Sequence, residues 1–523
     1  MGLNESSKES GQPVHNIIAR DRVKSLSELA EISRQARAEN KKVVLAHGVF
    51  DLLHLGHVRH LEAARKLGDV LIVTVTADKH VRKGPGRPVF PQGVRAEMLA
   101  ALGYIDWTGI NGAVTAVPLI EAIKPDFYVK GSDYADPAQD VTGKIDEERE
   151  LVEKCGGQIV FTDEITFSSS ALINEHFDIY NPEARTFLDD LRRNDSGERT
   201  LELVDRLADL KVLIIGETIV DEYDYVESMG KAAKENIIAT RYRGREKFAG
   251  GAVAAANHAA GFCNEVEVVT TIGADYEDLI DEHVLPNVKL SKFAEEGRPT
   301  IRKKRFVEED SLAKLFEVYY MEGALISDSV ARNIIAHIEA VADNYDVVIV
   351  CDFGHGLMVR SIIDAVVANA KFLAVNAQAN AGNMGHNLVT KYNRADYVCV
   401  DEKEARLAVQ DQNSEIETLV TQKLAQAMRS DRIAVTLGAR GCICWDRSSG
   451  LIKIPAFAHS PVDTIGAGDA FLAVTAPLFA VAGDAQEVGF VGNVVGGIKT
   501  GVVGHRQPVE KGAVKNAIVS LLK

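Results

Sequence analysis

Apolar residues along the chain gather in short β-branched runs that alternate with segments of helical periodicity. Each run leads into a glycine-containing turn and then a helical pattern, which is typical of βα units around a parallel sheet. Four runs lie in the first third of the chain, at 43–46, 70–75, 127–129 and 159–161. Six more follow at 212–215, 266–271, 347–351, 372–375, 397–400 and 433–437. The pattern predicts an α/β protein with two parallel sheets.

A polar, charged segment separates the two groups of strands. Residues 181–209 show a helical pattern with an interruption at 194–197, and a further helix is expected over 26–37. We therefore expect a disordered N-terminus at 1–20, a first domain at 21–180, a helical linker at 181–209 and a second domain at 210–523.

Composition narrows the class of function. The chain has 523 residues, of which 46% are hydrophobic, as in soluble globular proteins. Its 59 Lys and Arg against 75 Asp and Glu give a net charge of -16, which opposes a broad nucleic-acid surface. The longest weakly broken apolar run, 471–483, is shorter than the roughly 20 residues of a membrane span. The start of the chain lacks the apolar core of a signal peptide, and the six scattered cysteines form no C-x-x-C pair, so we expect a cytoplasmic protein without structural zinc or membrane partner.

The first candidate site directly follows the run at 43–46. His54 and His57 are spaced for one face of a helix's first turn, where free backbone N–H groups already favour anions. Gly56 between them lets a phosphate approach closely. Fixed donors of this kind suit attack on the α-phosphate of a nucleoside triphosphate. A solvated helix face or a chance metal pair is the alternative interpretation.

The stretch from Val43 to Asn174 resembles the cytidylyltransferase-like nucleotidyltransferases that carry an H-x-G-H motif. More narrowly, it resembles the adenylyltransferase domain of the bifunctional heptose-7-phosphate kinase / heptose-1-phosphate adenylyltransferase family, through HGVFDLLHLGHVRHLEAARKLGDVLIV, KGPGRPVFPQGVRAEMLAALGYIDW, IKPDFYVKGSDY and FSSSALI. The resemblance implies a Rossmann-like fold and transition-state stabilisation by His54 and His57. The implied nucleotide-binding residues are Phe50, Asp51, Lys83, Arg95, Lys130, Asp133, Ser168, Ser169 and Ser170.

Departures from the family and simpler interpretations accompany these roles. Thr76 stands where the family usually has Asn, which puts a sugar or nucleotide contact in question. Residues 168–170 replace a Ser-Thr-Thr run but keep its hydroxyls, and serines are also favoured helix N-caps. Lys83 and Arg95 could equally be ordinary solvated cations.

The second candidate site is Asp463-Thr464-Ile465-Gly466-Ala467-Gly468-Asp469 before an apolar helical run. Two glycines just before a helix form a turn whose N–H groups can face a transferring phosphoryl group. Asp469 is placed to accept a proton from an attacking hydroxyl. A Gly-Ala-Gly-Asp turn alone is a weak signal, since it also suits a plain helix entry.

From about Lys211 to Lys523 the chain resembles ribokinase-like sugar kinases in motif order and spacing. The matching segments are KVLIIGETIVDEY, AGGAVAAANHAA, PTIRKKRF, VVIVCDFGHGL, ADYVCVDEKEA, AVTLGARGCICW and DTIGAGDAF. The resemblance implies Asp469 as general base and ATP with Mg²⁺ as co-substrate and cofactor, with Asp401 and Glu404 organising the metal through water. The other implied nucleotide-site residues are Thr436, Gly438, Gly466, Ala467, Gly468 and Asn493. The implied sugar-site residues are Asp221, Gly250, Gly251 and Asp352, although strand-end capping or a turn would also explain the two aspartates.

The sugar end departs from the heptose kinases. Residues 230–236 lack their Arg-Ile-Ser-Pro-Glu-Ala-Pro-Val-Pro run, 376–378 read Asn-Ala-Gln for Asp-Pro-Lys, and Ala replaces an Asn soon after Gly250-Gly251. The domain order is also reversed, because the bifunctional family has its kinase first. Each domain is a complete folding unit, so reversal breaks neither fold.

Three hypotheses follow. The first is a bifunctional enzyme, expected to be a homo-oligomer, that phosphorylates a sugar or sugar phosphate and transfers a nucleotidyl group to a sugar 1-phosphate with release of pyrophosphate. The resemblance implies that the transferred group is adenylyl. Its product would be ADP-heptose or a relative used in lipopolysaccharide or another surface polysaccharide. The second is a CTP-dependent transferase acting on a polyol or other sugar phosphate. The third keeps the nucleotidyltransferase but makes the kinase-like half a non-catalytic sugar-binding or dimerising module.

Overall fold

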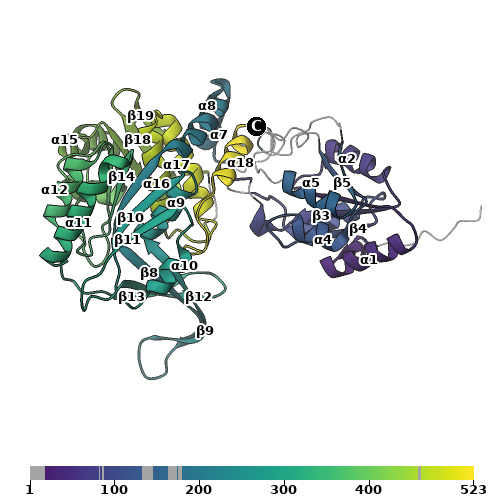
Figure 1. The fold of residues 1–523 in the computed structure, drawn as a ribbon, viewed down its shortest axis with the longest axis horizontal. Coiled ribbons are helices and arrows are strands. Elements are labelled where there is room, and N and C mark those ends of the chain that lie inside the picture. The colour runs from purple at the N-terminus through teal and green to yellow at the C-terminus, as the bar shows by residue number, and fades with distance from the viewer. Residues whose placement is uncertain are drawn as a thin grey trace, which may run out of the picture. The chain divides into compact units, whose positions relative to one another are not determined.

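The computed structural model describes residues 18–81, 83–84, 87–131, 145–162, 174, 180–457 and 461–523. The chain divides into two compact units, one of Met1–Arg82 and Arg87–Phe177, the other of Lys83–Gly86 and Asp178–Lys523 (Figure 1). Most of the segment 1–20, which was expected to be disordered, lies outside the described residues, and a short 3₁₀ helix begins at Ala19.

The first unit is a six-stranded parallel sheet in the order β1-β4-β3-β2-β5-β6. Its strands are β1 (Val23–Lys24), β2 (Val43–Gly48), β3 (Val70–Thr76), β4 (Trp107–Asn111), β5 (Phe127–Gly131) and β6 (Gln158–Thr162). Its helices are α1 (Leu26–Ala38), α2 (Leu55–Arg65), α3 (Gln92–Ala100), α4 (Val117–Ile123) and α5 (Ile145–Lys154). The four strands expected from the sequence are confirmed, whereas β1 and β4 are short and had no clear apolar run.

Helices cover both faces of this sheet, because its strands are apolar on both sides. Leu61 of α2 and Leu99 of α3 pack on one face. Leu29 of α1 and Ile120 of α4 pack on the other. The strand order reverses between β2 and β5, and ligands of open α/β sheets bind beyond the carboxyl ends of the strands at such a point.

The second unit contains a nine-stranded sheet in the order β11-β10-β7-β14-β15-β16-β17-β18-β19, in which β18 alone runs antiparallel to the other eight strands. The strands are β7 (Lys211–Gly216), β10 (Glu265–Thr271), β11 (Val288–Phe293), β14 (Val347–Asp352), β15 (Leu373–Ala377), β16 (Tyr397–Asp401), β17 (Arg432–Thr436), β18 (Cys442–Asp446) and β19 (Gly450–Ile454). All six expected strands are present. The reversal point here lies between β7 and β14.

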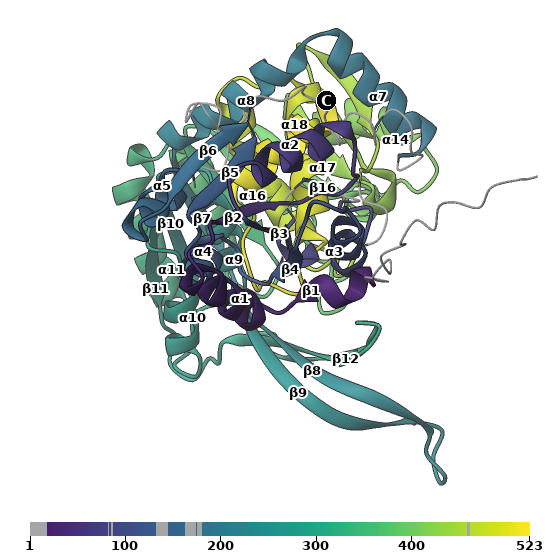
Figure 2. The same cartoon turned by 90° about the vertical axis from the view of Figure 1, so that its right-hand side faces the viewer.

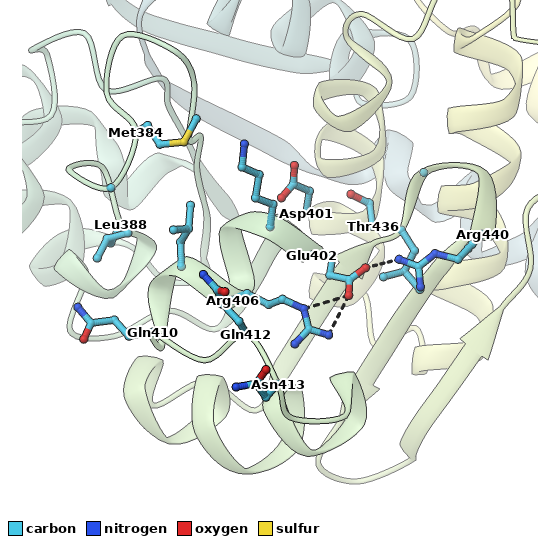
Figure 3. Close-up of a pocket in the computed structure, with 15 residues that line it drawn as sticks. Met384, Leu388, Asp401, Glu402, Arg406, Gln410, Gln412, Asn413, Thr436 and Arg440 are labelled. Atoms are coloured by element: carbon cyan, nitrogen blue, oxygen red, sulfur yellow. Dashed lines mark hydrogen bonds and ion pairs between the residues drawn. The ribbon is translucent and has the colours of Figure 1, made fainter.

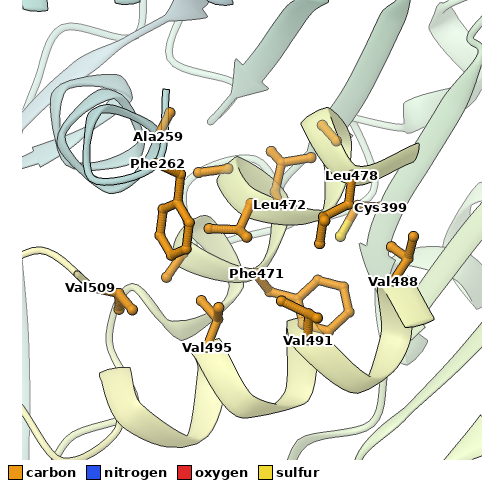
Figure 4. Packing of buried hydrophobic residues seen from close by; sticks show 14 of the residues in the cluster. Ala259, Phe262, Cys399, Phe471, Leu472, Leu478, Val488, Val491, Val495 and Val509 are labelled. Carbon is orange, nitrogen blue, oxygen red and sulfur yellow. The ribbon is translucent and has the colours of Figure 1, made fainter. Parts of the chain in front are cut away.

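Two helical layers enclose this sheet. One contains α9 (Ala252–Ala260), α16 (Ala467–Ala480), α17 (Ala485–Lys499) and α18 (Lys511–Leu522), packed in the cluster of Figure 4. The other contains α11 (Asp328–Val341), α12 (Arg360–Asn369), α13 (Glu402–Ala408), α14 (Ile416–Thr418) and α15 (Ala425–Met428). Within the expected linker, α7 (Pro182–Arg193) and α8 (Ser196–Arg206) confirm the helical break and bury apolar residues in the first cluster. The helix α10 (Glu277–His283) lies beside a smaller cluster.

A separate four-stranded sheet, in the order β13-β12-β8-β9, belongs to the second unit. Its strands are β8 (Thr218–Lys231), β9 (Ile238–Gly251), β12 (Ile301–Glu308) and β13 (Lys314–Tyr320). The β8–β9 ribbon extends away from the larger sheet in both views (Figures 1 and 2). Sequence periodicity did not predict this sheet, because its strands are rich in charged residues. In β12 every second residue is nevertheless buried, so one face is directed inward.

Among the described residues, no helix combines the length and apolar character needed to cross a membrane.

Candidate active sites

The first site lies where β2 leads into α2, at the reversal point of the six-stranded sheet. His54 is the N-cap residue of α2, and His57 is the third residue of that helix. Their imidazole rings stack, with centroids 3.9 Å apart and planes 23° apart. The ring of Phe50 lies 5.2 Å from that of His57, and its backbone has a φ of 49°, an unusual conformation for a non-glycine residue. The two histidines thus stand at the positive end of a helix, as the sequence predicted.

Two further histidines line the same strand-loop-helix segment. Burial and the charge of Lys130 lower the pKa of His47 to about 3 and that of His60 to about 4. His47 Nδ1 lies 2.9 Å from Thr74 Oγ1, and His60 Nδ1 lies 2.6 Å from the hydroxyl oxygen of a threonine at the end of β6. Both imidazoles are therefore neutral at neutral pH. Sequence reasoning did not single out either residue.

Asp51 and Arg95 organise the loops around these histidines. Asp51 is buried, and its Oδ1 accepts hydrogen bonds from the N–H groups of Val89 and Phe90 at 2.7 and 3.2 Å. The Arg95 guanidinium is also buried and donates to the carbonyl oxygens of Val49, Thr76 and Phe90 and to Asp78. A phosphate would have to displace one of these acceptors, so the geometry favours a supporting role for Arg95.

The structure describes only some of the other residues that were predicted to bind the nucleotide. Lys130, at the carboxyl end of β5, forms a 2.9 Å ion pair with Glu148. Lys83 belongs to the short stretch grouped with the second unit. Asp133 and residues 168–170 lie outside the described residues. Their roles remain predictions.

The second site lies at the N-terminus of α16. Gly466 is the N-cap with a φ of 76°, and a Cβ at this position would stand 2.4 Å from His505 Cε1. Ala467 and Gly468 are the first two helical residues, and a Cβ on Gly468 would meet no atom within 4 Å. Asp469 follows, and burial raises the pKa of its carboxyl while the charge of His505 opposes the rise. This turn exposes helix N–H groups beside a carboxylate, the arrangement expected for phosphoryl transfer.

The predicted sugar residues Asp221, Gly250 and Gly251 lie together at the base of the β8–β9 ribbon. A Cβ on Gly250 would stand 2.1 Å from Asp221 Oδ2, and Gly251 has a φ of 62°. Asp221 is ion-paired with Arg305, and its Oδ2 lies 3.4 Å from His505 Nε2. Burial opposes ionisation of Asp221, but the charge of Arg305 holds its pKa below the usual range.

Asp352 ends β14 on the other side of the reversal point and is fully buried. Its carboxylate accepts from Lys391 Nζ at 2.5 Å and from the Tyr392 hydroxyl at 2.7 Å. Glu217, which the sequence analysis missed, follows β7 and accepts hydrogen bonds from the N–H groups of Phe353 and His355, both at 2.9 Å. Burial and the charge of Asp352 raise the pKa of Glu217. The two carboxylates hold the loop that follows β14.

A cavity of about 1140 Å³ lies at the carboxyl ends of β16 and β17 (Figure 3). Asp401, Thr436 and Gly438 of the predicted nucleotide site line it. Glu404 lies behind Asp401 in a reciprocal capping box, and burial followed by the charge of Asp401 raises its pKa to about 7. The Asn493 amide instead donates to the carbonyl oxygens of Ile454 and Pro455, both at 3.0 Å.

Lys303 and His355 are further buried groups that sequence reasoning missed. Lys303 belongs to the inward face of β12, and among the described residues it forms no hydrogen bond or ion pair. Its Nζ lies 5.0 Å from the centre of the Tyr319 ring and 6.0 Å from that of Phe353. Burial lowers its pKa, whereas the charges of Asp221 and Asp469 raise it. His355 Nε2 is buried and has no hydrogen-bond partner in the described part of the chain, and its pKa is lowered to about 3 by burial and by the charge of Lys303. The run of four consecutive cations in PTIRKKRF was the available signal, because a strand directs two of the four to each of its faces.

Comparison with protein families agrees with this geometry. The cytidylyltransferase-like family matches residues 45–175, and the pfkB family of carbohydrate kinases matches residues 209–512, more than half of the chain. The chain belongs to the pfkB carbohydrate kinase family. The expected order, a cytidylyltransferase-like domain followed by a ribokinase-like kinase domain, is thereby confirmed.

Curated relatives match the N-terminal part. The bifunctional protein HldE of Trichlorobacter lovleyi is 42% identical over 140 residues, which are 26% of this chain and 27% of the relative. HldE of Alcanivorax borkumensis is 39% identical over 155 residues, 29% and 31% of the two chains. The matched part thus spans less than a third of each relative. Among solved structures, phosphofructokinase-2 from Escherichia coli in complex with potassium covers 60% of this chain and all of its own, with a TM-score of 0.50 and 15% identity, which shows the shared fold of the second unit.

Proposed function

We propose that the protein is a bifunctional enzyme of nucleotide-sugar synthesis. The kinase unit phosphorylates a sugar phosphate, and the nucleotidyltransferase unit joins an anomeric sugar phosphate to a nucleotide. The observation that carries this proposal is that each unit directs a helix N-terminus and its motif residues to the reversal point or carboxyl edge of its own sheet.

In the kinase step, Asp469 accepts the proton of the acceptor hydroxyl. The acceptor oxygen then bonds to the γ-phosphorus as the bond to the ADP oxygen breaks, and the N–H groups of residues 466–468 stabilise the phosphoryl oxygens. Asp401 lines the cavity and offers carboxylate oxygens that Mg²⁺ prefers, so it would hold the ion through water. Both oxygens of Glu404 accept from main-chain N–H groups, of Asp401 and Ala379, so Glu404 would act by holding Asp401 in place. When bound, Mg²⁺ neutralises phosphate charge. Thr436 and Gly438 would border the nucleotide in the cavity.

In the nucleotidyl step, a phosphate oxygen of the sugar 1-phosphate attacks the α-phosphorus of the nucleoside triphosphate. The bond between the α- and β-phosphates breaks, and pyrophosphate leaves. His54 and His57 at the start of α2 would stabilise the charge on the α-phosphate in the transition state. Lys130, Asp133 and residues 168–170 would hold the rest of the nucleotide.

We infer that the kinase acceptor is anionic. Lys303 is a buried cation without an ion pair among the described residues, and the electrostatics couple it to Asp469 and Asp221. An ammonium so placed would be costly without a ligand of opposite charge. A phosphate on the sugar supplies that charge, as a heptose phosphate would.

We further propose a cytoplasmic homo-oligomer, with a dimer as the simplest form. Large apolar side chains are exposed on the β8–β9 ribbon, at Met229, Ile237, Ile238 and Tyr242. Sedimentation velocity over a range of protein concentrations tests this. A monomer at all concentrations would contradict it.

The decisive experiment is mass spectrometry of the products after incubation with ATP, CTP or GTP and a panel of heptose, hexose and glycerol phosphates and the corresponding unphosphorylated sugars. The proposal expects a doubly phosphorylated sugar and, with a sugar 1-phosphate, an ADP-sugar. A CDP-polyol as the sole product would instead establish the CTP-dependent alternative. Absence of any sugar-dependent ADP formation would make the kinase unit a binding module.

A further inference from the structure

Lys499, the last residue of α17, is a fully buried lysine in the kinase unit. Its Nζ donates to two main-chain acceptors, the carbonyl oxygens of Ile465 at 2.8 Å and of Gly504 at 2.7 Å. Among the residues that the structure describes, no carboxylate forms an ion pair with it. A buried ammonium is costly unless it is paired, so its retention at this place calls for a reason.

Both acceptors belong to turns that shape the phosphoryl site. The Ile465 carbonyl lies immediately before Gly466, the N-cap of the helix that carries Asp469. Gly504 lies immediately before His505, whose ring packs against Gly466. One ammonium therefore connects the turn that binds the phosphoryl group with the turn that closes behind it.

Asp463, the nearby carboxylate in the first of these turns, is committed elsewhere. Its Oδ1 accepts from Lys314 Nζ at 2.5 Å, and its Oδ2 accepts from the Tyr223 hydroxyl at 2.7 Å and the Gly504 N–H at 2.8 Å. The charge of Asp463 is thus compensated by the four-stranded sheet. The positive charge of Lys499 remains available to the turn.

The electrostatics agree with this division. Burial lowers the pKa of Lys499, and the charges of Asp463 and Asp469 act against that decrease. Reciprocally, the charge of Lys499 acts against the rise of the Asp469 pKa that burial causes. Lys499 therefore favours the ionised form of the carboxylate that must accept a proton.

We propose that Lys499 is a positioning residue that provides a built-in monovalent cation to the kinase site, its ammonium filling a place between two carbonyl oxygens behind the phosphoryl-binding turn. The inference rests on the proposed kinase function. Turnover of the wild-type enzyme then needs no monovalent cation from solution. Removal of the side chain would expose two carbonyl oxygens that an added cation can bind.

The test compares Lys499→Ala, which removes the ammonium and leaves space, with Lys499→Met, which fills the space without charge. ADP formation by the full chain is measured in buffers whose only monovalent cation is tetramethylammonium, K⁺, NH₄⁺ or n-propylammonium. We expect wild-type kcat to be equal in all four. Lys499→Ala should lower kcat by about 100-fold, because the turn that carries the phosphoryl-binding N–H groups would no longer be held in place. The KM for ATP should change little. NH₄⁺ or n-propylammonium should raise the kcat of Lys499→Ala to at least about a tenth of the wild-type value. Neither cation should raise the kcat of Lys499→Met.

Equal activity of Lys499→Met and the wild type would overturn the inference, as would losses in Lys499→Ala that no cation reverses. A second readout does not depend on turnover. The melting temperature of the kinase unit should rise with NH₄⁺ or n-propylammonium in Lys499→Ala alone, relative to tetramethylammonium. If the wild type shows no sugar-dependent turnover, the proposed function fails, and this melting comparison still decides the role of Lys499.

Discussion

Each unit places a helix N-terminus at the carboxyl edge of a parallel sheet, but the side chains around that helix N-terminus differ between the two units. In the first unit the histidines around the start of α2 belong to one continuous segment, from His47 to His60, and the two buried ones are neutral. In the second unit the site assembles residues far apart in sequence, such as Asp221, Arg305 and Asp463. These groups are charged and compensate one another.

The difference follows from where each unit obtains its positive charge. At the start of α2, the free helix N–H groups favour an anion, and the stacked rings of His54 and His57 stand beside them. The kinase site buries whole ammonium and guanidinium groups, and each buried ion needs an opposite charge or acceptors nearby. We therefore expect the first site to respond most to substitutions around the start of α2, and the second to respond to substitutions in several distant elements.

The strongest test of this separation uses one substitution in each unit. His57→Ala should reduce pyrophosphate release by about 10²- to 10³-fold, because it removes a group that stabilises the transition state, and should leave sugar-dependent ADP formation unchanged. Asp469→Asn should reduce ADP formation by about 10²- to 10⁴-fold, because it removes the general base, and should leave pyrophosphate release unchanged. Both activities are measured on the same preparations. Loss of both activities in a folded variant would contradict independent sites.

The next prediction concerns the charge inside the kinase site. Lys303→Met should raise the KM for a sugar phosphate by about 10- to 100-fold, the cost of one charge-assisted hydrogen bond, with a smaller effect on kcat. Lys304→Met is the matched control, because Lys304 lies on the opposite face of β12 and pairs with Glu222 and Asp224. Steady-state kinetics with the acceptor varied measures both. Equal KM values for Lys303→Met and Lys304→Met would contradict the inference that Lys303 binds an anionic acceptor.

Sequence reasoning recovered the local parts of both sites. The strands with β-branched runs were found, and His54, His57, Gly466 and Asp469 stand at the helix starts that their motifs indicated. These features depend on neighbours within a few residues, so spacing alone predicts them.

What sequence reasoning missed depends on distant contacts. The charged strands β8, β9, β12 and β13 carry no strong apolar pattern, so their sheet was not predicted. Arg95 and Asp352 form hydrogen bonds and ion pairs with residues of other elements of the fold, and only the folded structure shows how many such contacts each one makes. A motif residue that is predicted to contact a ligand can instead form its hydrogen bonds with other protein groups. Sequence spacing does not distinguish these two cases.

A third prediction separates two glycines of the kinase turn. Gly466→Ala should lower the free energy of unfolding of the second unit by about 1–3 kcal/mol, because alanine resists a φ of 76° and its Cβ would collide with His505. Gly468→Ala, in the same helical turn but with open space around it, should raise that free energy by up to about 1 kcal/mol. Urea unfolding monitored by ¹⁹F NMR of 5-fluorotryptophan at Trp445 measures both. Destabilisation of similar size in the two variants would show that the turn does not require the left-handed conformation.

The last prediction concerns the pH dependence of the stability of the first unit. The His60 pKa is about 4 in the folded protein and near 6.5 in an unfolded chain, so between these values the unfolded state binds an additional proton. Stability should therefore fall as the pH drops from 6.5 towards 4. His60→Gln retains a partner for the Thr162 hydroxyl and removes this titration, so it should reduce that fall by about 1–3 kcal/mol. The chain has two tryptophans, and the ¹⁹F signal of Trp107 reports on the first unit while that of Trp445 reports on the second. His47 titrates in the same direction and remains in the variant, so the Trp107 transition alone should become less dependent on pH without losing that dependence. An unchanged slope there would show that His60 is already protonated in the folded unit.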